Sequence, residues 1–198
     1  MPKPDPLKLD PNEILTAEFE YIAQTAFQAN EDRARVASFY LASVGSFIAA
    51  IFGTQFLDKS FNPEIVHFGF SGLFALLTVL GTLTIIQLSR LRSAWHESAQ
   101  AMNQVKEFYI AKFPEMREAI RWRMETIPPK FKKDSMAHLL AIQVSILSGL
   151  TFGAAAFFLL WGLDLDSVWI WSAATLLAIV AYFVQMSIFG KPLKKGSK

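Results

Sequence analysis

Four stretches of apolar residues without a single charged side chain divide the chain. These windows, which contain no Asp, Glu, Lys or Arg, are residues 36–57, 65–89, 136–163 and 167–190, with 22, 25, 28 and 24 residues. A helix needs roughly 20 apolar residues to cross about 30 Å of hydrocarbon, so each window is long enough to span a membrane. Helices buried in a soluble core have shorter apolar stretches, of about 10–14 residues. The pattern therefore predicts an all-α integral membrane protein with four transmembrane helices.

The helix of the first window is expected to begin well before the window itself. Apolar residues precede it at alternating spacings of four and three, which places them on one helix face. They are Leu15, Phe19, Ile22, Ala26 and Ala29. Because residues 12–44 contain no Pro or Gly, we expect one helix over residues 12–57, roughly 70 Å long at 1.5 Å per residue.

The helix of the second window is expected to continue beyond the membrane in the same way. Asn62 and Pro63 are typical of an N-cap followed by proline at the first helical position. Residues 82–113 contain no Pro or Gly, so this helix can leave the membrane at Arg90 and continue. A short outer turn joins the two long helices, which must then lie antiparallel. Residues 12–113 are therefore predicted to form a helical hairpin with two long cytosolic extensions.

The second half of the chain is expected to form a tighter hairpin over residues 136–190. The loop between its two windows has only a few residues, and Asp166 or Ser167 can cap the helix that follows. Asp134 or Ser135 can cap the helix of the third window in the same way.

The segments outside the two hairpins carry most of the prolines and many of the lysines. Residues 1–11 are predicted to be a flexible arm, and residues 191–198 a basic tail. Residues 114–135 are predicted to contain a short cytosolic helix over Glu115–Thr126, followed by a linker rich in Pro and Lys.

The distribution of positive charge predicts the orientation of the spans. Of the 19 Lys and Arg residues, 18 lie in the N-terminal segment, the central loop or the tail, and Lys59 is the exception. Lys and Arg accumulate on the cytoplasmic side of membrane proteins, so both termini are expected there. The side chains expected to anchor this topology and to contact anionic lipid headgroups are Arg33, Arg35, Arg90, Arg92, Lys130, Lys132, Lys133, Lys191, Lys194 and Lys195.

The sequence offers little that would support catalysis. It contains no cysteine and no HExxH, GxSxG, Walker A or GxGxxG motif. His96 and Glu97 are neighbours in sequence, but adjacent helical positions do not face each other. We therefore predict no catalytic residue, no metal site, no cofactor, no nucleic-acid partner and no small-molecule substrate.

His67 and His138 lie near the ends of their windows, and the polar residues further inside are amides and hydroxyls, so no acidic, basic or histidine side chain lies in the middle of a span. This argues against a proton pump, a proton-coupled transporter or a voltage sensor. Gln87, Gln143 and Gln185 lie in the cytosolic third of three different spans. They can bond to one another at about 0.6–2 kcal/mol per bond. They would then act as packing contacts or as a polar ring at the inner mouth of a pore.

Two of the spans carry small residues at a spacing of four. Such stripes let helix backbones approach closely, within a protomer or between copies. The stripe of the first span comprises Ala42, Ser46 and Ala50, preceded by Ser38, and that of the third comprises Ser145, Gly149 and Gly153. We expect at least one stripe to support self-association.

Large apolar side chains on the cytosolic segments are candidates for docking a partner. Trp95, Tyr109 and Trp122 are the main candidates, because exposed aromatic residues are typical of protein interfaces. The partner could be a second copy of the chain or another membrane protein.

In its architecture, the segment 12–113 resembles the SLATT family of bacterial membrane modules, in which a cytosolic helix precedes and follows a two-span hairpin. The resemblance covers about half of the chain, and spans three and four depart from the two-span plan. It implies an effector that is coupled to nucleotide-signalled defence and perforates the bacterial membrane.

Two functional hypotheses follow from these patterns. The first is a non-enzymatic multi-pass protein of the bacterial inner membrane that self-associates, or serves as a small subunit of a membrane complex, and docks through its cytosolic helices. The alternative is an oligomeric pore or channel-like effector of the SLATT type, gated by the same helices. Leakage of a dye from liposomes would separate them.

Overall fold

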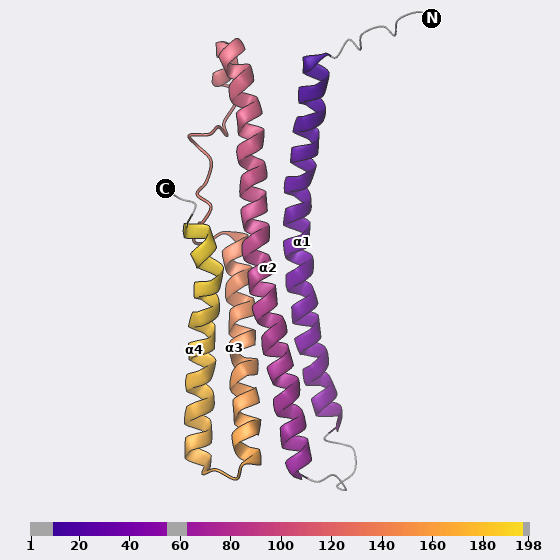
Figure 1. The fold of residues 1–198 in the computed structure, drawn as a ribbon, viewed down its shortest axis with the longest axis vertical. Helices are drawn as coiled ribbons and strands as arrows, with labels where there is room; N and C mark the ends of the chain where they lie inside the picture. Colours follow the sequence, from indigo (N-terminus) through magenta and orange to yellow (C-terminus); the bar gives the residue numbers. More distant parts are fainter. Residues whose placement is uncertain (1–9, 55–62, 196–198) are drawn as a thin grey trace, which may run out of the picture.

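The computed structural model describes residues 10–54 and 63–195 and consists of helices and connecting turns (Figure 1). Four α-helices and one short 3₁₀ helix occur in this part of the chain, which contains no β-strand. They are α1 (Pro11–Thr54), α2 (Pro63–Lys112), η1 (Pro114–Arg117), α3 (Met136–Gly162) and α4 (Ser167–Lys194). All four α-helices are long and apolar enough to cross a membrane. The predictions of an all-α fold and of four helices able to cross a membrane are thus confirmed.

The two long helices predicted from the absence of Pro and Gly are both present. α1 has 44 residues and α2 has 50. Asp10 accepts a hydrogen bond from the backbone N–H of Asn12 at 2.9 Å, which caps the start of α1. α2 ends at Lys112, shortly before Pro114, because proline has no backbone N–H with which to continue the helical hydrogen bonds. The predicted Asn62 cap, the flexible arm up to residue 9, the end of the first span after Thr54 and the last three residues of the tail lie outside the described residues.

α1 and α2 form an antiparallel hairpin that extends well beyond the other two helices (Figure 1). We call residues 11–35 of α1 and 90–112 of α2 the extension hairpin, and the remainder of the α-helices the four-helix part. α2 is central, because it packs against α1 on one side and against α3 and α4 on the other. The buried core of the four-helix part comprises Ala37, Tyr40, Val44, Leu77, Ile85, Leu88, Ala137, Ala141, Val144, Phe189 and Leu193.

The tight hairpin of α3 and α4 begins at the predicted residue, but α4 continues past the predicted end at residue 190 to Lys194, so part of the predicted tail is helical. Ser135 is the N-cap of α3, and its side chain accepts a hydrogen bond from the backbone N–H of His138. Asp166 occupies the N-cap position of α4, although its side chain forms no capping hydrogen bond. Asp134 and Asp164 adopt positive φ angles of 61° and 56° in the turns that precede these helices, a conformation that aspartate tolerates better than most residues.

The predicted helix over Glu115–Thr126 is wrong. This segment contains only the four-residue helix η1, followed by turns. The hydroxyl of Thr126 accepts from the backbone N–H of Arg123 and donates to the carbonyl of Arg121, so a side-chain-stabilised turn replaces the helical hydrogen bonds. Helices this short are marginal without a packed face, and most of this segment is exposed.

Candidate functional site

Uncharged polar side chains meet in the interior of the four-helix part. We call this group the polar cluster, and all four helices contribute to it. Its members are Tyr40 from α1, Thr78 and Thr82 from α2, Ser148 and Thr151 from α3, and Gln185 from α4.

Hydrogen bonds connect α2, α3 and α4 within the polar cluster. The amide nitrogen of Gln185 donates to the hydroxyl of Ser148 at 2.6 Å and to that of Thr82 at 3.3 Å. Ser148 donates to the backbone carbonyl of Thr78 at 3.3 Å, and the hydroxyls of Thr78 and Thr151 lie 3.0 Å apart. An unpaired polar group is costly in an apolar interior, so these bonds hold the three helices in one register.

α1 reaches the polar cluster through Tyr40. The Tyr40 hydroxyl is buried beside Ser148 and Thr151 without a well-formed hydrogen bond. Gly81 makes this approach possible, because a Cβ atom there would collide with Ser148 and with the Tyr40 hydroxyl. In the described part of the chain, the Ser145 hydroxyl and the side-chain oxygen of Gln185 are also buried without a hydrogen-bond partner. The interior therefore keeps three oxygen atoms with unused hydrogen-bonding capacity.

The structure does not bring the three predicted glutamines together. Gln185 is 3% exposed and belongs to the polar cluster, whereas Gln87 and Gln143 are exposed. Among the hydrogen bonds of the described residues, none joins two of these glutamines. Gln185 thus has the geometry of a packing contact, and its partners are hydroxyl groups from α2 and α3.

The two stripes of small residues face in opposite directions. Ser145, Gly149 and Gly153 of α3 are buried. A Cβ atom on Gly149 would approach the carbonyl oxygen of Ala178 to 2.7 Å, and one on Gly153 would approach that of Ala174 to 2.8 Å. The stripe of α3 is therefore used within the protomer, where it lets α3 and α4 pack backbone to backbone.

The stripe of α1 lies on the outer side of the bundle. Ala42, Ser46 and Ala50 are all exposed. A Cβ atom added to Gly45 or Gly53, on the same side of α1, would meet no other atom within 4 Å. The opposite side of α1, with Tyr40 and Val44, packs into the bundle core. This stripe is therefore free of contacts within the protomer.

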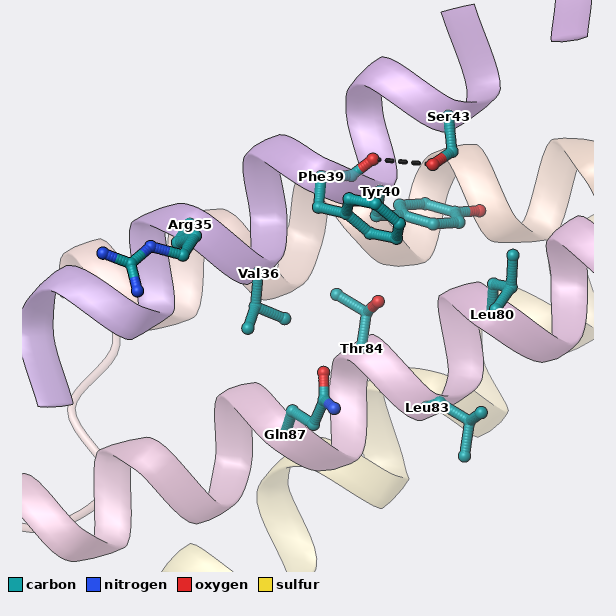
Figure 2. A pocket seen from close by; sticks show the side chains of 9 residues that line it. All are labelled: Arg35, Val36, Phe39, Tyr40, Ser43, Leu80, Leu83, Thr84 and Gln87. Atoms are coloured by element: carbon teal, nitrogen blue, oxygen red, sulfur yellow. Dashed lines mark hydrogen bonds between the residues drawn. The ribbon is translucent and has the colours of Figure 1, made fainter. Parts of the chain in front are cut away.

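A groove of about 390 Å³ lies between α1 and α2 at the end of the four-helix part nearest the extension hairpin. In Figure 2, Val36 from α1 and Thr84 and Gln87 from α2 point into the space between the two helices. Arg35 lines the groove as well, and the remaining walls are mostly apolar. These walls are formed by Phe39, Tyr40, Ser43, Leu80 and Leu83.

The basic residues predicted to anchor the topology differ in their exposure. Most are exposed, and Arg35 forms a 3.5 Å ion pair with Asp32. Arg33 and Arg92 are instead buried, at 8% and 6% exposure. Lys130 is half-buried and pairs with Glu97 at 3.4 Å. The other predicted anchors are exposed; they are Arg90, Lys132, Lys133, Lys191, Lys194 and Lys195.

The buried basic residues have perturbed acid–base properties. Burial lowers the pKa of Arg33, and the nearby charge of Arg92 lowers it further. Burial also lowers the pKa of Arg92. The pKa of His96 is lowered by burial and then by the charges of Arg92 and Lys130, with Glu97 opposing. Positive groups therefore accumulate at one place between α1, α2 and the linker before α3.

The three aromatic residues predicted to dock a partner have different environments. Trp95 is half-buried, and its ring lies 4.5 Å from the guanidinium carbon of Arg92. Tyr109 lines a groove of about 330 Å³ in the extension hairpin, together with Phe19 and Met116. Trp122 is 49% exposed. Trp95 thus has a role within the protomer, and Tyr109 and Trp122 remain candidates for docking.

The described residues hold no arrangement of catalytic or metal-binding groups that we can assign to a reaction. In residues 10–54 and 63–195, no three His, Asp or Glu side chains are arranged to hold a metal ion. His96 and Glu97 do not act together there, because Glu97 pairs with Lys130.

Sequence reasoning missed the polar cluster and the burial of Arg33 and Arg92. The cluster consists mainly of Thr and Ser, which are common in membrane helices and individually carry no signal. Arg33 could have been found, because it continues the apolar series of α1 four residues after Ala29 and seven before Tyr40. A residue at such a position faces the neighbouring helix whatever its charge.

Comparison with known proteins found no match to this chain among family models, curated proteins or solved structures.

Proposed function

We propose that this chain is a non-enzymatic multi-pass protein of the bacterial inner membrane that self-associates through the outer side of α1. In this proposal the extension hairpin and both termini lie in the cytoplasm. Four long apolar helices and the clustering of Lys and Arg at one end of the molecule support this placement.

The observation that carries the proposal is the contrast between the outer sides of α1 and α4. Both helices lie at the edge of the bundle (Figure 1). α4 exposes large side chains such as Leu176, Val180 and Phe183, which suit contact with lipid tails. α1 also exposes large side chains, among them Phe39, but it differs from α4 in exposing the stripe that contains Ala42 and Ser46. Small residues give lipid tails little to pack against, but they allow a second helix to approach closely.

The extension hairpin supplies a second reason to expect a copy of the chain as the partner. On the same helix, Ile14 and Tyr21 are 50% and 67% exposed, and their spacing of seven residues places them on one face. This part of α1 lies in water in the proposed topology, where burial of large apolar side chains is favourable. Two α1 helices related by a two-fold axis would cover both features with one self-complementary surface.

The size of the protein in mild detergent tests the proposal. We expect the wild-type chain to be a dimer or a larger homo-oligomer, and Ser46→Leu to shift it toward the monomer. Ser172→Leu is the matched control, since Ser172 is exposed on α4 and the substitution is the same. A monomeric wild-type protein, or equal effects of the two variants, would contradict the assignment to α1. A monomer that co-purifies with a different membrane protein would identify a subunit of a larger complex instead.

The pore-forming alternative of the SLATT type is tested in the same preparation. A pore would need several copies arranged around an axis, with α1 as a lining helix and the extension hairpin as a gate. Purified protein in liposomes should leave a trapped dye in place if the function is assembly alone. Dye release that is lost in Ser46→Leu and kept in Ser172→Leu would favour the pore.

A further inference from the structure

Two buried arginines meet at the junction of α1, α2 and the linker that leads to α3. Arg33 and Arg92 are both more than nine-tenths buried. Neither pairs with a carboxylate, because the ion pairs among the described residues join Arg35 to Asp32 and Lys130 to Glu97. Two like charges are therefore buried close together without a counter-charge of their own.

The protein holds Arg92 firmly in this position. Its Nε donates to the carbonyl oxygen of Lys130 at 3.0 Å, and one terminal nitrogen donates to that of Pro129 at 3.2 Å. The ring of Trp95 covers the guanidinium plane at 4.5 Å. These contacts use two of its five N–H groups and fix the direction of the others.

Arg33 has no comparable partner. Its Nε is buried without a hydrogen bond in the described part of the chain. Its terminal nitrogens form no hydrogen bond with the described residues either, yet they are not enclosed, so the end of the side chain can be reached from outside. The four N–H groups of its terminal nitrogens are thus available to a ligand.

His96 adds a third unpaired group to the junction. It lies one helical turn beyond Arg92 on the same side of α2, is buried, and its Nδ1 atom has no hydrogen-bond partner among the described residues. Val36 of α1 and Gln87 of α2 line the same groove, and in an antiparallel helix pair this places Arg33 opposite the turn of α2 that carries Arg92. The charge of Arg92 lowers the pKa of both Arg33 and His96, which agrees with this placement.

Buried charges are normally paired, because removing a charge from water is costly. A guanidinium group offers a rigid fork of donors that fits the oxygens of phosphate, with two parallel hydrogen bonds from each arginine. An oxyanion at the junction would neutralise the two arginines and give the free donors of Arg33 a partner.

We propose that the junction of α1, α2 and the linker binds a phosphate group, held by the guanidinium groups of Arg33 and Arg92 with His96 beside them. Arg33 lies three residues before the first charge-free window, and Arg92 three residues after the second. This is the level of lipid headgroups in the proposed topology, so the phosphate of an anionic phospholipid is the expected source. The site is separate from the outer side of α1, on which self-association is proposed.

The test compares Arg33→Gln with Arg35→Gln in the full-length protein purified in mild detergent. The two substitutions remove the same charge from the same helix, but Arg35 is exposed. One arm measures by native mass spectrometry how much phosphatidylglycerol, relative to phosphatidylcholine, stays bound. The other arm measures the shift in melting temperature caused by inorganic phosphate in the millimolar range.

We expect Arg33→Gln to reduce phosphatidylglycerol retention by about tenfold or more, and Arg35→Gln to change it by less than about twofold. Arg33→Lys should give an intermediate value, because lysine keeps the charge but lacks the planar fork. A melting shift by inorganic phosphate that depends on Arg33 would identify the free ion as a sufficient ligand. If neither probe distinguishes Arg33→Gln from Arg35→Gln, the proposal is wrong.

The melting temperature of the unliganded protein shows whether a variant loses binding only because it is misfolded. Without phosphate or anionic lipid, Arg33→Gln should melt at the same temperature as the wild type or higher, since it removes an unpaired buried charge. A variant that melts lower in the absence of both ligands would show that Arg33 stabilises the fold by itself, which would also contradict the proposal.

Discussion

The stripes of small residues on α1 and α3 have nearly the same spacing and composition but opposite environments. On α3, Gly149 and Gly153 lie against the backbone of α4. On α1, Ala42 and Ser46 are exposed, and Gly45 has open space around it. A small-residue stripe therefore predicts a close helix contact without saying which helix makes it. The stripe on α3 is used within the protomer, and the one on α1 is left for a partner.

The largest difference is expected between leucine substitutions of Gly149, in the stripe of α3, and of Gly45, beside the stripe of α1. Gly149→Leu forces a side chain against the carbonyl oxygen of Ala178 and should lower the free energy of unfolding by about 3 kcal/mol or more. Gly45→Leu should leave the protomer's stability within about 0.5 kcal/mol of the wild type, and should reduce self-association. Denaturant titration in mixed micelles measures the first quantity, and size in mild detergent the second. Equal loss of stability in both variants would contradict the contrast.

A second contrast concerns two tryptophans, the half-buried Trp95 of the extension hairpin and the exposed Trp122 of the segment that follows it. Trp95→Ala removes the ring stacked on Arg92 and should cost about 2 kcal/mol of stability. Trp122→Ala should change stability by less than about 0.5 kcal/mol, yet weaken partner binding or oligomerisation. Thermal melting and size in detergent are the two measurements. If Trp122→Ala leaves both oligomerisation and partner binding intact, Trp122 is not a docking residue.

A third contrast lies among the glutamines. Gln185→Leu removes the hydrogen bonds to Ser148 and Thr82 and should lower the free energy of unfolding by about 1–2 kcal/mol. Gln143→Leu, on the exposed side of α3, should have an effect close to zero or slightly favourable in lipid. The same titration distinguishes them. If Gln143→Leu lowered the free energy of unfolding as much as Gln185→Leu, exposed amides would also have structural partners, and the contrast would be wrong.

The smallest expected effect is a pH dependence that arises from His96. Its pKa is lowered in the folded protein by burial and by the charges of Arg92 and Lys130, so the unfolded chain binds the proton more readily. The contribution of His96 to stability is therefore fully present above about pH 6.5, and is lost as the pH falls through the lowered pKa. Melting curves between pH 7.5 and 5 should show a steeper loss of stability for the wild type than for His96→Gln. Identical pH profiles would contradict the assignment.

Much of the fold could be predicted from the sequence because its determinants are local. The length of the charge-free windows identifies the candidate spans, and the absence of Pro and Gly predicts the continuous helices α1 and α2. The error at Glu115–Thr126 has a local cause too, since apolar spacing alone cannot stabilise a short helix when most of its residues are exposed.

The details of the site depend on which helix faces meet, and sequence spacing does not contain that information. Three glutamines at similar depth suggested a ring, but only Gln185 points inward. Arg33 looked like one more surface anchor, because charged residues are rarely buried. Arg33 nevertheless occupies a position in the apolar series of α1, and this position indicates that it is buried against the neighbouring helix.

Disulfide cross-linking from single cysteines tests the role of α1 most directly, because the natural chain contains no cysteine. Ser46→Cys places a thiol on the outer stripe of α1, and Val180→Cys places one on the exposed side of α4. After mild oxidation in native membranes, we predict a covalent dimer from Ser46→Cys and little or none from Val180→Cys. Equal yields from the two positions, or a dimer from Val180→Cys alone, would contradict self-association through α1.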